Sequence, residues 1–154
     1  GVGRNFPFLN TVARRVVGFD LPPMIARCRQ LASDRVDGLE DDWAQVSRQR
    51  FDLIYASLVL QHVETDACRA YLDGFAAMAP AVYLLTRNDS DFGAGILDMV
   101  AASGRYRAGE CVEVDHDPDT HQLRVLGRMT FDEARRASPG RHFEVWLDRV
   151  EPAR

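Results

Sequence analysis

Short apolar runs alternate with amphipathic stretches along the first two thirds of the chain. Residues 15–20, 51–56 and 81–86 are mostly apolar over about one strand length, which is typical of strands buried in a parallel sheet. After Pro22 and after Thr65-Asp66, which can cap a helix, apolar residues recur at helical spacing, so each stretch predicts a helix with one buried face. Strands that alternate with helices predict an α/β fold, in which a sheet of parallel strands is covered by helices on both faces.

The last third of the chain has a different pattern. Residues 110–116 and 122–129 are strand-like runs on either side of the turn-forming cluster 117–120, and they predict an antiparallel hairpin. The further elements that the pattern predicts are a strand over 36–39, helices over 96–101 and 131–137, and a last strand over 142–147. No linker-like segment interrupts the pattern, so we expect residues 1–154 to form a single domain.

Composition narrows the class of protein. The chain has 154 residues, 46% of them hydrophobic and 27% charged, as in an ordinary globular domain. The net charge of −4 gives no reason to expect a nucleic-acid or membrane partner, and we interpret the use of Arg for all 19 basic residues as a coding bias. No membrane-spanning run or signal peptide is visible. The three cysteines lack metal or disulfide spacing, so we expect free thiols in the cytoplasm.

Two glycines and an acid near the start of the chain are candidates for ligand binding. Gly1 and Gly3 would let the backbone approach a ligand, and Asp20, at the end of the first predicted strand, can accept two hydrogen bonds from a ribose diol. Dinucleotide-binding enzymes use the same geometry, but their motif needs a third glycine where this chain has Arg4 or Phe6. A nicotinamide cofactor is therefore disfavoured, while a plain turn followed by a strand-ending acid stays open as an alternative.

The order of several segments resembles one enzyme family. Gly-Val-Gly-Arg-Asn, then Val-Val-Gly-Phe-Asp-Leu-Pro-Pro-Met-Ile, then Asp-Asp-Trp, and then Phe-Asp-Leu-Ile-Tyr-Ala-Ser-Leu-Val-Leu-Gln-His are similar to class I S-adenosylmethionine-dependent methyltransferases over roughly residues 1–90. The resemblance implies a Rossmann-like, doubly wound, mostly parallel sheet in a three-layer α/β/α fold, with S-adenosylmethionine as cofactor. It also accommodates the antiparallel hairpin at the C-terminus.

The resemblance assigns roles to individual residues. Gly1 and Gly3 correspond to the last two glycines of the family's cofactor loop, and Asp20 corresponds to the acid that holds the ribose hydroxyls. The other cofactor-binding residues that it implies are Leu21 beside the adenine, Asp42 and Trp43 in the loop that reads the adenine edge, and Ala56, Ser57 and Leu58 after the fourth strand of the family.

The family has a central strand, an acid and a further glycine before the position of Gly1. We therefore expect an N-terminally truncated methyltransferase domain, or, as an alternative, a strand supplied by another chain. The functions that follow are methyl transfer to a small-molecule acceptor, or a non-catalytic methyltransferase-like fragment. A nucleotide-binding oxidoreductase is a third possibility that Phe6 disfavours.

A few polar residues could contribute to the acceptor side of the site. His62, just beyond the predicted strand 51–56, is the candidate catalytic base, with a polar junction residue as the alternative. Asp89-Ser90-Asp91 could contact the acceptor or cap a helix. Residues 115–121 are rich in His and Asp, but the Asp-Pro-Asp-Thr within them is typical of a turn, so we expect no metal site.

Overall fold

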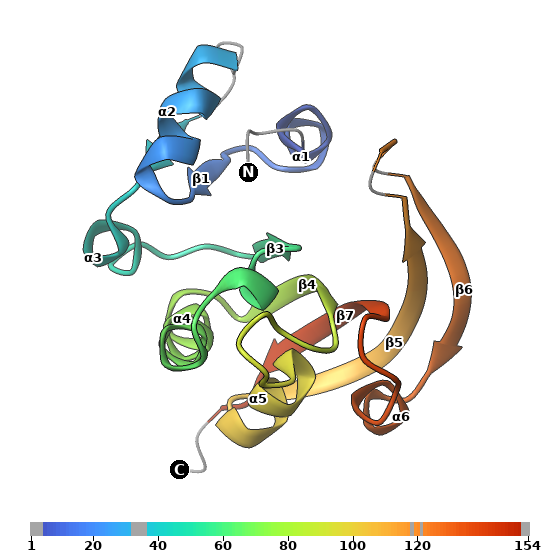
Figure 1. Ribbon diagram of the computed structural model, residues 1–154. Helices are drawn as coiled ribbons and strands as arrows, with labels where there is room; N and C mark the ends of the chain where they lie inside the picture. The colour runs from blue at the N-terminus through green and yellow to red at the C-terminus, as the bar shows by residue number, and fades with distance from the viewer. Residues whose placement is uncertain (1–4, 32–36, 118, 121, 152–154) are drawn as a thin grey trace. The chain divides into compact units, whose positions relative to one another are not determined.

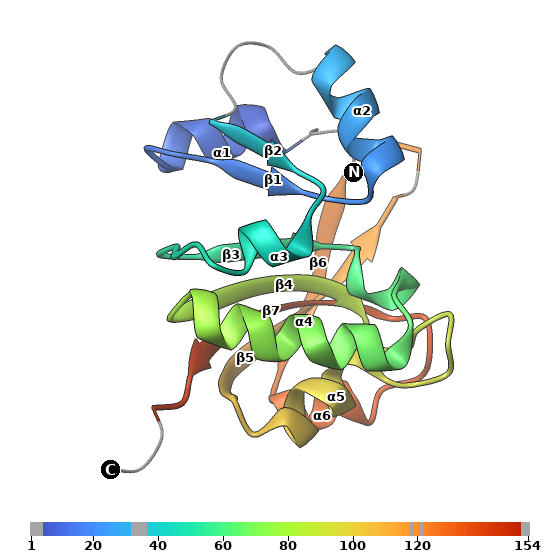
Figure 2. The ribbon, with the colours of Figure 1, turned by 90° about the vertical axis from the view of Figure 1, so that its left-hand side faces the viewer.

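The computed structural model describes residues 5–31, 37–117, 119–120 and 122–151, and the chain forms two compact units, Gly1–Gln49 and Arg50–Arg154. Figures 1 and 2 show the helices and strands from two sides. Each unit contains its own pair of parallel strands, so the units are described one after the other.

The first unit combines a two-stranded parallel sheet with helices. Its elements in chain order are α1 (Phe6–Val12), β1 (Val17–Phe19), α2 (Pro22–Leu31), β2 (Gly38–Glu40) and α3 (Trp43–Val46). β1 pairs with β2, with Val17 opposite Gly38 and Phe19 opposite Glu40. Ile25 and Cys28 lie on one face of α2 and are buried, which confirms the apolar stripe predicted after Pro22.

Gly18, in the middle of β1, allows the close approach of α1. A Cβ atom at this position would lie 2.6 Å from Cζ of Phe6 and 3.1 Å from Cδ2 of Leu39. Side chains do not approach one another this closely, so the absence of a side chain at Gly18 lets the Phe6 ring lie directly on the strand. Phe6, whose position argues against a dinucleotide motif, is therefore a packing residue of the first unit.

The second unit is built on a mixed five-stranded sheet. Its elements are β3 (Ile54–Ser57), the 3-10 helix η1 (Leu60–His62), α4 (Thr65–Met78), β4 (Ala81–Arg87), α5 (Ile96–Ser103), β5 (Tyr106–His116), β6 (Leu123–Met129), α6 (Phe131–Arg135) and β7 (His142–Arg149). The strand order is β3-β4-β7-β5-β6, in which β3 and β4 are parallel and the other neighbours are antiparallel. β7 thus lies between β4 and β5, and β6 forms the far edge.

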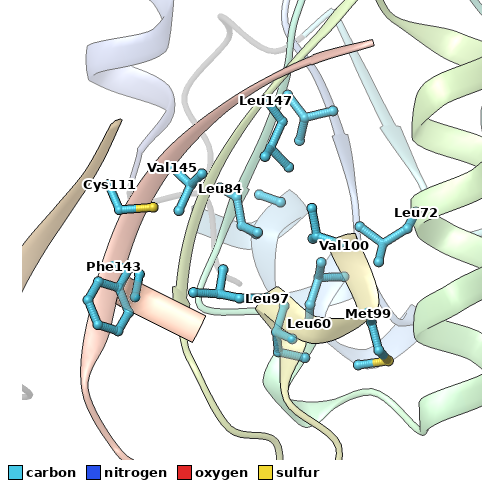
Figure 3. Close-up of a cluster of buried hydrophobic side chains, with 14 of the residues drawn as sticks. Leu60, Leu72, Leu84, Leu97, Met99, Val100, Cys111, Phe143, Val145 and Leu147 are labelled. Carbon is cyan, nitrogen blue, oxygen red and sulfur yellow. The ribbon is translucent and has the colours of Figure 1, made fainter. Parts of the chain in front are cut away.

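Apolar side chains of the sheet and of α4 and α5 form the core of the second unit (Figure 3). Leu72 on α4, Leu97 on α5, and Leu84, Val145 and Leu147 on the strands are each at most 1% exposed. Burial of a side chain of this size contributes roughly 1.5–3 kcal/mol to stability. The core therefore lies against β4 and β7, the second and third strands of the sheet.

Aromatic side chains occupy the opposite face of the same strands. Tyr55 on β3 lies opposite Tyr83 on β4, which in turn lies opposite Trp146 on β7. The rings of Tyr55 and Tyr83 are parallel, with centroids 5.2 Å apart. Since side chains alternate along a strand, this row points away from the core that contains Leu84.

Most of the predicted elements are present, with small shifts at their ends. The hairpin of residues 110–116 and 122–129 is confirmed as β5 and β6, and the early strands form parallel pairs as the strand–helix alternation predicts. The proposed cap of α4 was wrong, because Glu64 is the N-cap and Thr65 begins the helix. The short elements α1, α3 and η1 were not predicted.

Replacement of Gly18 should show how tightly α1 packs on β1. Gly18→Ala is expected to destabilise the first unit by roughly 1–3 kcal/mol, the usual cost of adding volume to a packed contact. Urea unfolding followed by Trp43 fluorescence in a Trp146→Phe background would report on this unit alone. Gly38→Ala is the matched control, because its nearest neighbour would be Cγ1 of Val17 at an ordinary 3.6 Å. Equal stability of the two variants would contradict the close contact.

Candidate functional site

Asp20 and Asp42 lie just beyond the carboxyl ends of two neighbouring strands. Asp20 follows β1 directly and Asp42 comes two residues after β2, and the two strands are parallel. The carboxyl ends of parallel strands share one edge of the sheet, which is where open α/β sheets bind ligands. The first unit therefore brings both predicted acids to the edge at which a cofactor is expected.

Both carboxylates also organise their own loops. Oδ1 of Asp20 accepts a 2.7 Å hydrogen bond from the backbone N–H of Leu21. Asp42 is the N-cap of α3, where its Oδ1 accepts a 2.8 Å hydrogen bond from the N–H of Ala44. A carboxylate has about four acceptor positions, so such a local bond is compatible with ligand binding by the same group.

Apolar groups accompany the two acids. The indole of Trp43 packs on the ring of Phe19, with centroids 5.4 Å apart and a tilt of 52°. Leu21, directly after Asp20, is 65% exposed, so its side chain is accessible to a ligand. Gly1 and Gly3 lie outside the described residues, and their place in a cofactor loop stays a prediction.

The carboxyl end of β3 has a strained backbone. Ala56 is buried in β3, Ser57 ends the strand, and Leu58 follows with a φ of 53°. Among the described residues, Leu58 alone combines a side chain with a positive φ, which costs roughly 1–2 kcal/mol. Its N–H donates a 2.7 Å hydrogen bond to the carbonyl of Leu85 on β4, which holds this conformation. Strain of this kind clusters at ligand-binding sites.

His62 and Asp91 form a close pair beyond the carboxyl ends of β3 and β4. Nδ1 of His62 lies 2.6 Å from Oδ2 of Asp91. The backbone N–H of Asp91 also donates a 2.8 Å hydrogen bond to the carbonyl of Gln61, which joins the two loops. The structure thus brings two sequence candidates together, and Asp91 contacts His62 and does not cap α5, whose N-cap is Gly95.

Arg87, the last residue of β4, holds the acidic loop in place. Its Nη2 donates a 2.8 Å hydrogen bond to Oδ1 of Asp91, and its Nε donates a 3.1 Å bond to Oδ1 of Asp89. Asp89 in turn accepts a 3.1 Å bond from the N–H of Gly140, just before β7. Sequence reasoning missed Arg87, although a strand-ending arginine with aspartates two and four residues later is a signal for such a clamp.

The electrostatics of this cluster define which atoms donate and accept. The hydrogen bond from His62, followed by that from Arg87, holds the pKa of Asp91 below its usual range. Asp91 is therefore ionised at neutral pH and can only accept, so Nδ1 of His62 must donate to it. In the neutral imidazole Nε2 is then the acceptor, and the side chain is 57% exposed, so a substrate can reach it.

The cysteines contribute no nucleophile to the site. Cys28, Cys68 and Cys111 are all free and buried, as the sequence predicted. Burial raises the pKa of Cys68 and that of Cys111 to about 11, so both thiols are protonated at neutral pH. Since a thiolate is the reactive form, neither residue is a candidate for covalent chemistry.

The acidic segment between β5 and β6 forms the expected turn. Oδ1 of Asp117 accepts hydrogen bonds from the N–H groups of Asp119 and Thr120, as in an Asx turn. Among the residues that the structure describes, which exclude His121, no group of three or more His, Cys, Asp or Glu side chains could hold a metal ion. In the same part of the chain, no helix has both the length and the apolar character needed to cross a bilayer.

Two substitutions at Leu58 would measure the strain at the end of β3. Leu58→Gly and Leu58→Ala both remove the side chain, but only glycine adopts a positive φ without cost. The glycine variant is therefore expected to be more stable than the alanine variant by about 1–2 kcal/mol, as judged by urea unfolding. Greater stability of the alanine variant would show that the backbone is unstrained.

The ion pairs of Asp91 predict a dependence of stability on pH. Because the pKa of Asp91 is lowered in the folded chain, its contribution is complete above the ordinary carboxyl pKa of about 3.9. It is then lost as the pH falls through the lowered value. The urea midpoint of the wild type should exceed that of Asp91→Asn near pH 7, and the difference should vanish in strong acid. If the two urea midpoints still differ in strong acid, the difference comes from packing and not from the charge of Asp91.

Comparisons with known proteins agree with this geometry. A family model described as "Methyltransferase domain" matches residues 1–78, which is just over half of the 154-residue chain. None of the curated proteins that were compared matches the chain.

Solved structures have the same fold at low sequence identity. One described as "Conversion of a Disulfide Bond into a Thioacetal Group during Echinomycin Biosynthesis" has a TM-score of 0.64 and 18% identity, covering 99% of this chain and 74% of its own. "PigF with SAH" has a TM-score of 0.55 and 12% identity, covering 97% and 54%. An O-methyltransferase family protein from Burkholderia thailandensis has a TM-score of 0.53 and 14% identity, covering 99% and 58%. The chain thus spans little more than half the length of the last two.

These likenesses confirm the predicted Rossmann-like α/β fold with antiparallel strands at the C-terminus. The family match extends from the first residues through β3 and α4, which includes Asp20, Asp42 and His62. The chain belongs to the methyltransferase domain family, and its resemblance to the class that uses S-adenosylmethionine is confirmed.

Proposed function

We propose that this chain binds S-adenosylmethionine and takes part in methyl transfer to a small-molecule acceptor. The observation that carries the proposal is the position of Asp20 and Asp42, two acids at the shared carboxyl edge of β1 and β2. The chemistry of the cofactor fits both groups, because ribose hydroxyls and an adenine amino group donate hydrogen bonds and carboxylates accept them.

The proposed roles are those that the family resemblance gives to single residues. Asp20 would hold the ribose hydroxyls, Leu21 would contact the adenine, and Asp42 with Trp43 would read the adenine edge. For Ala56, Ser57 and Leu58 the resemblance implies backbone that runs beside the cofactor. The strained φ of Leu58 supports this, since strain is retained where a binding loop needs a fixed path.

When bound, the cofactor supplies a methyl group on a sulfonium that is already strongly electrophilic. The protein then has to position a nucleophile in line and accept a proton from it if it carries one. His62 is our candidate for that second task, because its Nδ1 is engaged by Asp91, which leaves Nε2 as the acceptor, and its side chain is 57% exposed. We therefore assign the role of catalytic base to His62.

The charge of the protein supports a small-molecule acceptor. A net charge of −4 gives no long-range attraction to the phosphates of nucleic acid. The first of the three similar structures carries a description from echinomycin biosynthesis, which is small-molecule chemistry. Free, buried cysteines suit a reducing compartment, and we place the activity in the cytoplasm.

Calorimetric titration with S-adenosylmethionine, S-adenosylhomocysteine and NAD tests the proposal. We expect micromolar binding of the first two and none of NAD. Asp20→Ala should weaken binding by about 1–3 kcal/mol, the cost of losing hydrogen bonds to a charged group. Asp66→Ala is the matched control, because this carboxylate lies in the first turn of α4 and its side chain is 97% exposed.

The outcomes of the titration separate the alternatives. A folded chain that binds neither S-adenosyl compound would be a non-catalytic relative that keeps the fold without the cofactor site. Unchanged affinity in Asp20→Ala would reject the ribose role of that residue. Equal loss in the Asp66→Ala control would assign the effect to net charge.

A further inference from the structure

Asp91 fixes the proton on the imidazole of His62. The 2.6 Å contact joins Nδ1 to a carboxylate that is ionised at neutral pH. Hydrogen bonding at one ring nitrogen determines which nitrogen carries the proton in a neutral histidine. The pair therefore keeps the proton on Nδ1 and leaves Nε2 as a proton acceptor.

The carboxylate of Asp91 is held from two directions. Its Oδ2 contacts His62, while its Oδ1 accepts a 2.8 Å hydrogen bond from Arg87. The main chain is fixed as well, because the N–H of Asp91 donates to the carbonyl of Gln61, next to His62. A single surface ion pair contributes little to stability, but these contacts together define one orientation for the His62 ring.

We propose that Asp91, clamped by Arg87, is a positioning residue that presents Nε2 of His62 as the proton acceptor, and that the methyl acceptor is a nucleophile carrying a proton, such as a hydroxyl. This inference rests on the proposed function, because it specifies the substrate class of the same site. A nucleophile without a proton, such as a tertiary amine, would gain nothing from an oriented base.

The proposed step balances in atoms and charge. A bond forms between the acceptor oxygen and the methyl carbon, while the carbon–sulfur bond breaks and its electrons stay on sulfur. The hydroxyl proton moves to Nε2 of His62. The positive charge thus leaves the sulfonium and ends on the imidazolium, where the Asp91 carboxylate stabilises it.

Nitrogen NMR of the histidine rings tests the orientation without any acceptor. In protein labelled with ¹⁵N-histidine, two-bond ¹H–¹⁵N spectra at a pH where His62 is neutral show which ring nitrogen is protonated. The chain has four histidines, so His62→Gln assigns the signal. We expect the Nδ1–H form to predominate in the wild type and to become the minor form in Asp91→Ala.

Two further variants serve as controls. Asp89→Ala removes the other carboxylate on Arg87 with the same change in charge, and it should keep the Nδ1–H form because Asp89 does not touch His62 in the structure. Arg87→Gln keeps the Asp91 carboxylate but removes its clamp, so it should lower the Nδ1–H population by less than Asp91→Ala does. It also gives a second measurement if Asp91→Ala fails to fold.

An Nε2–H form in the wild type would overturn the inference. So would an unchanged Nδ1–H population in both Asp91→Ala and Arg87→Gln. The titration with S-adenosylmethionine gives a separate result. Asp91→Ala should bind S-adenosylmethionine as the wild type does, because Asp91 acts on the acceptor side. If the wild type does not bind S-adenosylmethionine, the proposed function is wrong. The position of the proton on the His62 ring would still show whether Asp91 orients His62.

Discussion

The parallel pairing of β3 and β4 determines which side chains of the second unit meet at the edge of its sheet. Both strands end at the same edge of the sheet, so the loops that follow them must meet there. One of these loops carries His62 and the other carries Asp91, and the hydrogen bond from Asp91 to Gln61 joins them. Without this pairing, two residues separated by 29 positions in the sequence would have no reason to be neighbours. The apolar core behind β4 holds the pairing in place.

Most helices and strands could be predicted from the sequence because the patterns that mark them are local. Continuous apolar runs marked β1, β3 and β4, and helical spacing after Pro22 and Thr65 marked α2 and α4. The Asp-Pro-Asp-Thr cluster located the turn of the hairpin. The elements α1, α3 and η1, of seven, four and three residues, were not recognised in the sequence. The cap of α4 was misplaced because Glu64 takes the N-cap position without a side-chain hydrogen bond, so no capping residue marks it.

The site was only partly predictable for a different reason. Asp20 and His62 could be named because each follows an apolar run, and a strand end is visible in a sequence, whereas Asp42 was named through the family resemblance. The contact between His62 and Asp91 depends on which strands are neighbours and on where two loops turn, which no local pattern contains. The strain at Leu58 was equally hidden, since nothing about a leucine in sequence signals a positive φ.

The double attachment of Arg87 has a consequence for motion. One of its carboxylate partners, Asp89, is tied to Gly140 at the entrance to β7, and the other, Asp91, is tied to His62 after β3. Asp91 is also held by its own N–H on the carbonyl of Gln61, so the imidazole keeps its carboxylate partner even if the bond between Asp89 and Gly140 breaks. The contact with Asp91 orders the ring in advance, so a ligand that binds to it would not have to immobilise it. The corner before β7 and the loop after β3 are thus linked through one guanidinium, although they lie far apart in the sequence.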